Sequence, residues 1–252
     1  MTTVGEILTW MNEKYPFSLA ESFDNCGLLI GDPSAAVSRC VLALDATAAV
    51  VKDAAEQGAE LLLTHHPVIF SPVRHLRAGD IPFEAARNGL AVISSHTCLD
   101  KADGGVNDVL AALLSLRDVT VPEEGEGILR IGELPEAVEP RAFAEHCKEV
   151  LNADGVRVVL GDRPVKRVAL CSGAGGSFVE TVLALGCDGY LTGELKHHEA
   201  VMAANAGLTV VDAGHFETET IVLPKLKREL EEAFPEAEFV LSDKNLPLME
   251  WL

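Results

Sequence analysis

The chain has 252 residues, of which 48 % are hydrophobic and only 5 % aromatic, and its formal net charge is −19. This length provides one large or two small domains with enough apolar side chains for a real core. The negative charge argues against nucleic acid and against an anionic membrane surface as partners. We expect a small-molecule partner. An anionic ligand would need local cations to offset the charge of the chain.

The N-terminus and the cysteines predict a cytoplasmic protein. No stretch is long and apolar enough to span a bilayer, and the first 17 residues lack the basic start and long apolar centre of a secretory signal. The six cysteines are scattered and form no C-x-x-C pair. This usage is typical of reduced thiols in the cytoplasm.

The first part of the chain alternates between strand and helix patterns. The predicted elements are a helix at 3–14, strands at 27–32 and 39–46, a helix at 47–58, a strand at 59–66, a helix at 82–89, a strand at 90–96 and a helix at 106–115. Thr47 is the expected N-cap and Gly58 the expected stop of the second helix, and Asn107 is a candidate cap of the fourth. This alternation predicts parallel sheets covered by helices on both faces.

A stretch rich in Glu, Gly and Pro, residues 118–140, is the expected domain junction. The alternation then resumes with helix 140–152, strands 156–160 and 167–173, helix 176–185, strand 188–194, helix 196–206, strand 208–215, helix 218–233 and strand 238–243. Trp251 in the tail is expected to be a packing anchor. The sequence thus predicts an N-terminal α/β domain over 1–122 and a C-terminal α/β domain over 123–252, with the last segment free to pack back on the first domain.

The two halves resemble each other in the order of their elements. Each contains a strand, a small-residue turn, a helix, a Gly-containing turn and a second strand. Further on, each has an apolar strand that ends in a histidine with an acid four residues later, His96 with Asp100 and His215 with Glu219. We therefore expect two similar α/β domains with mainly parallel sheets, facing each other across a cleft.

Histidines follow the predicted strands at the end where parallel α/β sheets collect ligands. His65 and His66 come after a run of leucines, and His96 and His215 end two further strands. Imidazole nitrogen and carboxylate oxygen are donors that Zn, Fe and Mn ions prefer. Because adjacent strand residues point in opposite directions, the His65–His66 pair is expected to serve two neighbouring ions.

Two carboxylates complete this set of candidate metal ligands. His215 and Glu219 have helical i, i+4 spacing, so that one turn can direct both side chains to one ion. Asp100 lies in a stretch that has the pattern of a loop and is not constrained in this way. The sequence therefore predicts a metal site of His65, His66, Asp100, His215 and Glu219, whereas His75 and His146 have the pattern of ordinary surface histidines.

Other polar stretches offer substrate-binding or acid–base groups, each with a plain structural alternative. Gly104, Gly105 and Asn107 lie in a Gly-rich loop that enters a helix, and this loop is either a substrate loop or a turn. Lys196 and His198 are candidate acid–base groups or exposed helix surface. Asn25, next to Asp24, belongs either to a cleft wall or to a turn. For the stretch SGAGGS at 172–177, a structural turn is favoured over a phosphate cradle.

Five motifs resemble the NIF-three-like family, whose bacterial members are often labelled GTP cyclohydrolase 1 type 2 homologs. The motifs are AESFDNCGLLIGD, LLLTHHPVIF, SSHTCLDKADGGVNDVLA, GYLTGELKHHEA and DAGHFETE, in this order over about residues 20 to 220. Phe23 departs from the family pattern, which usually has Trp there. At 252 residues the chain is similar to the short form of the family, without an inserted domain.

The resemblance implies a two-domain subunit with a dinuclear metal site in the interdomain cleft and a ring-shaped homohexamer. The implied ligands are His65, His66, Asp100, His215 and Glu219, with His96 as an outer-shell residue or occasional ligand. It also implies a dinuclear metal-dependent hydrolase that opens the guanine ring of GTP at C8 and releases formate. His96, His198 or Lys196 would then protonate a leaving group. A metal-dependent phosphoesterase acting on nucleotides and a non-catalytic metal-binding scaffold or adaptor remain alternatives.

Overall fold

The structure is a computed structural model that describes residues 1–249, so the predicted role of Trp251 lies outside the described residues. By internal contacts the chain divides into two compact units. Unit 1 comprises Met1–Ala102 and Val222–Leu246, and unit 2 comprises Asp103–Ile221 with the described residues from Pro247 onward.

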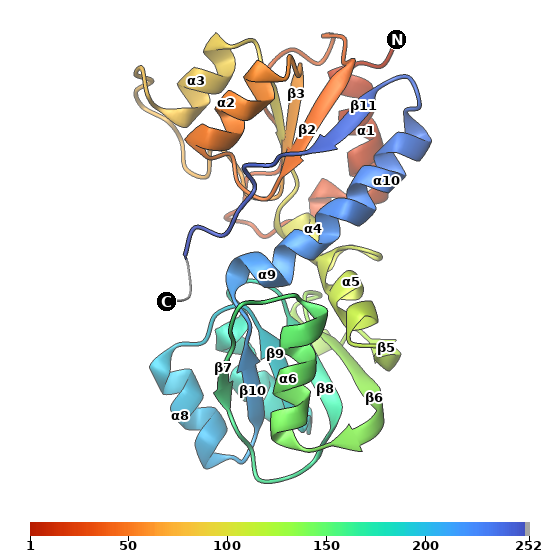
Figure 1. Ribbon diagram of the computed structural model, residues 1–252, viewed down its shortest axis with the longest axis vertical. Coiled ribbons are helices and arrows are strands. Elements are labelled where there is room, and N and C mark those ends of the chain that lie inside the picture. Colours follow the sequence, from red (N-terminus) through yellow and green to blue (C-terminus); the bar gives the residue numbers. More distant parts are fainter. Residues whose placement is uncertain (250–252) are drawn as a thin grey trace. The chain divides into compact units, whose positions relative to one another are not determined.

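Unit 1 contains a five-stranded sheet in the order β1-β4-β3-β2-β11 (Figure 1). Strands β4, β3, β2 and β11 are parallel, and β1 is antiparallel at the edge. The strand bounds are β1 Gly27–Ile30, β2 Arg39–Ala43, β3 Leu61–Thr64, β4 Ala91–Ser94 and β11 Glu238–Leu241.

Helices cover both faces of this sheet (Figure 1). Helices α2 (Ala48–Glu56) and α3 (Ile81–Arg87) pack on one face, and α1 (Val4–Lys14) and α10 (Leu223–Ala233) pack on the other. The predicted ends of α2 are confirmed. The Thr47 hydroxyl accepts a hydrogen bond from Val50 N at 3.2 Å, and Gly58 follows the helix with φ +70°.

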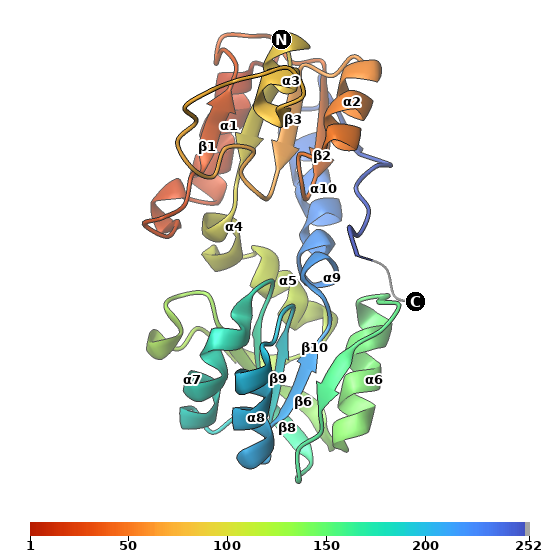
Figure 2. The same ribbon diagram turned by 90° about the vertical axis from the view of Figure 1, so that its left-hand side faces the viewer.

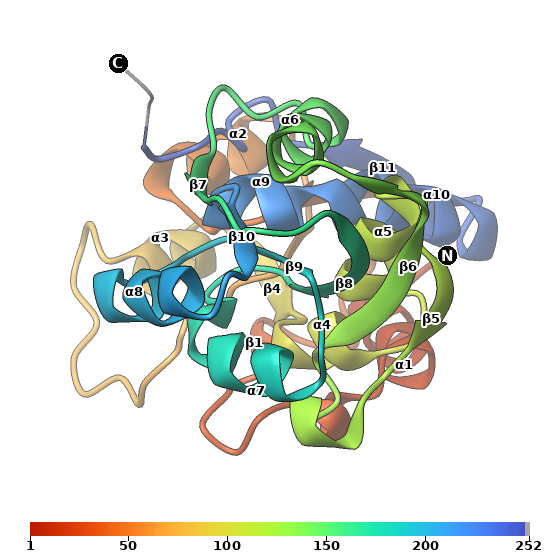
Figure 3. The same ribbon diagram turned by 90° about the horizontal axis from the view of Figure 1, so that it is seen from below.

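Unit 2 contains a six-stranded sheet in the order β5-β6-β8-β9-β10-β7. Its centre, β8-β9-β10, is parallel, and the remaining pairs are antiparallel. Helices α5 and α6 cover one face, and α7 and α8 cover the other (Figures 2 and 3). The bounds are α5 Val106–Leu113, β5 Arg117–Thr120, β6 Arg130–Val138, α6 Pro140–Val150, β7 Arg157–Val159, β8 Val165–Cys171, α7 Val179–Ala184, β9 Gly189–Thr192, α8 His197–Asn205 and β10 Thr209–Asp212.

The predicted fold class is confirmed, because both sheets are flanked by helices and parallel in their centres. Short helices complete the units: α4 (Thr97–Lys101), α9 (His215–Glu219), and 3₁₀ turns at Phe17–Leu19, Glu123–Gly125, Gly175–Phe178 and Thr220–Val222. Within residues 1–249, no helix has the length and apolar character needed to cross a membrane.

Three predicted elements need correction. The stretch 118–140 holds most of β5 and all of β6. Strand β5 lies at the sheet edge and is exposed along its length, so its sequence lacks the apolar pattern that would predict a strand. The helix predicted at 218–233 begins at His215 and is interrupted after Glu219, since Pro224 lacks the N–H that would continue the ladder. The N-cap of α5 is Gly105 and not Asn107.

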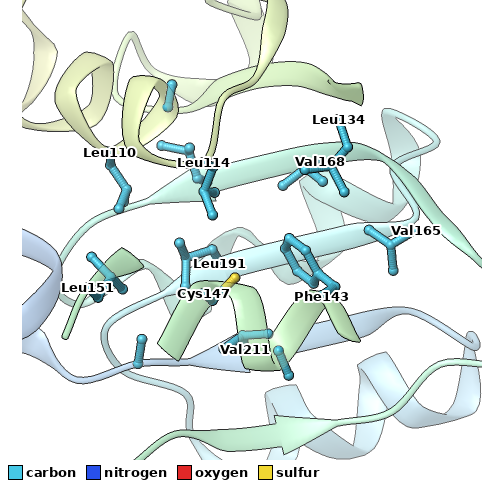
Figure 4. Packing of buried hydrophobic residues seen from close by; sticks show 14 of the residues in the cluster. Leu110, Leu114, Leu134, Phe143, Cys147, Leu151, Val165, Val168, Leu191 and Val211 are labelled. Atoms are coloured by element: carbon cyan, nitrogen blue, oxygen red, sulfur yellow. The ribbon is translucent and has the colours of Figure 1, made fainter. Parts of the chain in front are cut away.

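The core between the unit 2 sheet and helices α5 and α6 is shown in Figure 4. Phe143 on α6 is fully buried there among Val165, Val168 and Leu191. Burial of this ring removes a large apolar area from water. Because the core is close-packed, loss of the ring would leave a cavity.

We predict that Phe143→Ala lowers the free energy of unfolding by about 3–5 kcal/mol, because it leaves a cavity in this core. Urea denaturation followed by circular dichroism measures the change. Phe143→Leu, which keeps most of the volume, is the matched control and should cost clearly less. A loss below about 1 kcal/mol for the alanine variant would contradict the packing described.

Candidate functional site

The parallel strands of unit 1 end at the same level. Ala43 of β2 pairs with Thr64 of β3, which in turn pairs with Ser94 of β4. Two residues beyond these partners the chain reaches Asp45, His66 and His96, respectively. Register alone therefore gathers one carboxylate and two imidazoles at the carboxyl edge of the sheet, where α/β proteins bind ligands.

Three of the unit 1 histidines are held through their Nδ1 atoms. His65 Nδ1 lies 2.9 Å from the Ser95 carbonyl oxygen, His66 Nδ1 2.8 Å from Asp45 Oδ1, and His96 Nδ1 2.9 Å from Asp24 Oδ1. A carbonyl or an ionised carboxylate only accepts, so each Nδ1 carries the proton and donates it. Nε2 is then the ring nitrogen through which a neutral imidazole can bind a metal ion.

The three imidazoles form one group. One ring nitrogen from each of His65, His66 and His96 lies within 4.8 Å of the corresponding atoms of the other two. The ring centroids are 5.0 Å apart for His65 and His66, and 5.3 Å for each of these with His96. This group could hold a metal ion. Strand β3 ends at Thr64, so both His65 and His66 lie in the bend beyond it. That each of them serves its own ion stays a prediction.

Asp100, on α4, lies beside His65. This helix of one turn begins directly after His96, and its backbone is bonded from Asp100 N to His96 O at 3.2 Å. Asp100 Oδ1 lies 3.6 Å from His65 Nε2, and both side chains are buried. The expectation that Asp100 lies in a loop is therefore wrong, although the residue lies beside a predicted ligand.

Asp24 is the buried carboxylate that orients His96. Its Oδ2 atom accepts from Thr97 N at 3.0 Å and from the Thr97 hydroxyl at 2.5 Å, while Oδ1 faces His96. Burial alone would raise the pKa of the Asp24 carboxyl, but the hydrogen bonds from His96 and Thr97 outweigh burial and hold this pKa below its usual range. The ionised carboxylate fixes the His96 ring in place.

Unit 2 repeats the arrangement within its own sheet. Cys171 of β8 pairs with Thr192 of β9, which in turn pairs with Asp212 of β10. Glu194 follows Thr192 by two residues, and His215 follows Asp212 by three. Glu194 Oε1 lies 2.7 Å from His215 Nδ1, and so a fourth histidine has its Nδ1 held by an oxygen acceptor.

Glu219 lies on the side of His215 opposite Glu194. Helix α9 places them one turn apart, with His215 Nε2 3.0 Å from Glu219 Oε2, as the i, i+4 spacing predicts. The Glu219 side chain is buried against Gly173, where an added Cβ would come within 2.1 Å of its Oε1 atom. Gly173 also has φ +58°, so both the space and the backbone require glycine at this turn.

The other predicted site residues have contacts as follows. Asn107 is buried and accepts from Ser172 N at 2.8 Å, and Asn25 Nδ2 donates to Ile69 O at 2.6 Å. Gly104 N donates to Asp108 Oδ2 at 2.6 Å. Lys196 caps α8, and the His198 side chain is 73 % exposed. His75 is also exposed, and His146 is partly buried.

Two residues that support the histidines were not predicted, namely Asp45 and the carbonyl of Ser95. Asp45 follows β2 in the sequence, and an acid just beyond a strand of a parallel sheet is a usable signal. Glu194 lies in the same stretch as Lys196 and His198, and its carboxylate has a defined partner in His215. The donor atoms of both units, imidazole Nε2 and carboxylate oxygen, suit Zn, Fe or Mn ions.

Known proteins similar to this chain agree on one family. A family model described as Duf34/NIF3 (NGG1p interacting factor 3) matches residues 2–247. A Clostridium perfringens protein named GTP cyclohydrolase 1 type 2 homolog is 31 % identical, with 99 % of each chain covered. A Streptomyces coelicolor protein of the same name is 35 % identical, with 87 % of this chain and 82 % of the relative covered.

Solved structures agree with the family match. A Staphylococcus aureus hypothetical protein superposes with a TM-score of 0.91 and 26 % identity, covering 99 % of each chain. The structure titled Reduced HcgD from Methanocaldococcus jannaschii gives a TM-score of 0.84 and 31 % identity, covering 96 % of this chain and 98 % of the other. The fold of this chain is therefore shared along its whole length.

We predict that Asp24→Asn weakens binding of a divalent metal ion about 10- to 100-fold, because the charge that fixes His96 is lost. Isothermal titration of the metal-free protein with Zn²⁺ or Mn²⁺ measures the affinity. Asp32→Asn is the matched control, since Asp32 lies in an exposed turn bonded to Ser34. Equal affinities of the two variants would show that the Asp24–His96 contact does not support metal binding.

Proposed function

The chain belongs to the Duf34/NIF3 family, and we propose that it is a metal-dependent hydrolase whose histidines and acidic side chains hold divalent cations. The observation that carries the proposal is the common orientation of four histidines. In each of four histidines Nδ1 is bonded to an oxygen acceptor, so Nε2 is the nitrogen that can ligate a metal ion. These residues are His65, His66, His96 and His215. Such orientation by a second layer of hydrogen bonds is typical of metal-ligating histidines.

We propose two ions per chain, of the Zn, Fe or Mn kind. The described residues offer six donor side chains: His65, His66, His96 and Asp100 in unit 1, and His215 and Glu219 in unit 2. A single tetrahedral ion such as Zn²⁺ takes four ligands, so six donors favour more than one ion. That both groups serve one dinuclear centre stays a prediction from the sequence.

Different residues of the chain have different roles in the proposed hydrolysis. The histidines bind through Nε2, while Asp24, Asp45 and Glu194 keep their rings in one tautomer. Asp100 and Glu219 are buried carboxylates that can ligate or take up a proton. Bound divalent cations of this type lower the pKa of water toward neutrality and stabilise developing negative charge.

GTP is the first substrate to test, because the curated relatives carry the name GTP cyclohydrolase 1 type 2 homolog. The proposed reaction is hydrolytic opening of the guanine ring at C8 with release of formate. His96, His198 and Lys196 are the proposed acid–base groups. His96 has Nδ1 bonded to Asp24, so for this residue metal ligation and proton transfer through Nε2 are alternative roles.

The resemblance to the family also implies that the chain works as a homohexamer, which we keep as a proposal about its assembly. Light scattering coupled to gel filtration measures the number of chains. The activity tests below use the protein in whatever assembly it forms, so they do not depend on this number.

We predict that His65→Ala reduces formate release from GTP by more than the 10- to 100-fold typical of an outer-shell substitution, because it removes a donor atom itself. The assay uses purified protein supplied separately with Zn²⁺, Mn²⁺ or Fe²⁺ and counts formate per chain. His75→Ala removes a histidine from an exposed loop and should retain the wild-type rate.

Unchanged formate release from the His65→Ala protein would refute the role of this group in catalysis. Phosphate release from nucleotides without formate would instead assign a phosphoesterase to the same residues. Metal binding without turnover of any nucleotide would favour a metal-holding scaffold.

A further inference from the structure

Two exposed phenylalanine side chains lie beside the histidine group of unit 1. Phe23 is 62 % exposed and Phe70 is 50 % exposed. Their ring centroids are 6.2 Å apart, and the Phe70 ring lies 6.3 Å from the ring of His96 at a steep angle of 73°. A continuous series of rings therefore runs from the histidine group to Phe23.

This exposure is unusual within the molecule. All other Phe, Tyr and Trp side chains within residues 1–249 are buried or partly buried. A ring left in water forgoes the stabilisation that its burial would provide. The two rings for which this holds are neighbours, and they adjoin the group with the metal-binding chemistry.

The segment that carries Phe23 is firmly attached to the edge of the histidine group. Glu21 N donates to the Thr97 hydroxyl at 2.9 Å, and the Glu21 carboxylate pairs with Lys101 at 2.5 Å. Asn25, through its bond to Ile69 O, ties this segment to the one that ends in Phe70. The two rings are thus held in position rather than left on free loops.

We infer that Phe23 and Phe70 form a platform that binds a planar heteroaromatic ring of the substrate, such as a nucleobase, next to His96. The two phenyl rings are in contact range of each other, so the ligand ring lies on their exposed faces and not between them. Stacking on phenyl faces accepts any flat ring, so it assigns a class of ligand and not one base.

The distribution of charge fits two separate binding roles, one for the platform and one for the histidine group. Asp24, Asp45 and Asp100 surround the histidine group, whereas the platform rings carry no charge. An uncharged ring thus meets no repulsion at the platform, and the polar part of the same ligand reaches the cations. The inference rests on the proposed function only in taking these cations as the place where that polar part binds.

The test compares a ligand that has a base with one that lacks it. Affinities of GTP and of inorganic tripolyphosphate are measured by titration calorimetry on the metal-loaded protein. The Phe23→Leu/Phe70→Leu double variant keeps apolar volume but loses both rings, and it should bind GTP about tenfold or more weakly. Its affinity for tripolyphosphate and for the metal ion should not change.

Two further variants separate stacking from other effects. Phe23→Trp keeps an aromatic face and should retain the wild-type affinity for GTP. Leu76→Ala removes another exposed apolar side chain, on the segment that follows Phe70, and should leave both affinities unchanged. Light scattering on the double variant reports whether the platform is instead a contact between copies of the chain.

Several results would overturn the inference. Unchanged GTP affinity in the double variant, or an equal loss for GTP and tripolyphosphate, excludes a ring-binding platform. The same holds if wild-type protein binds purine and pyrimidine triphosphates no better than tripolyphosphate. Ring-dependent binding without hydrolysis would refute the proposed hydrolase and leave the platform intact, so the two failures are distinguishable.

Discussion

In-register parallel pairing is the constraint on which the candidate site depends. Within unit 1, the pairing of Ala43, Thr64 and Ser94 brings the residues that follow them to one level. A slip of one residue in β3 would move one of the two histidines into the place of the other and break both anchoring bonds. The leucines of β3, buried on both faces, hold that register, so the core of the sheet positions the chemistry at its edge.

The same constraint recurs within unit 2, which explains why the halves look alike although their sheets differ at the edges. The parallel trio β8-β9-β10 corresponds to β2-β3-β4, and Glu194 has the place in its sheet that His66 has in the other. One unit thus puts a histidine where the other puts a carboxylate. In both, a short helix with an acid among its last two residues follows the last strand of the trio.

The sequence predicts the strand ends and the residue types of the site, because apolar runs followed by histidines are local signals. The sequence does not predict contacts that depend on which strands or loops are neighbours in the fold. Asp45 becomes a partner of His66 only through the register of β2 with β3, and Phe23 meets Phe70 only because Asn25 binds Ile69. Helix α4 is a single turn, too short for periodicity to reveal, and β5 lacks the apolar alternation of a half-buried strand.

Under the proposed function, the charge of the candidate site would set the order in which ligands bind. Asp24, Asp45 and Asp100 adjoin the unit 1 histidines, and the nearby Lys101 is already paired with Glu21. Together with the net charge of −19, these carboxylates attract cations and repel anions. An anionic substrate therefore gains from the site only after divalent ions have reversed its local charge. The proposed platform of phenyl rings would bind a neutral ring in either state, because stacking does not depend on that charge.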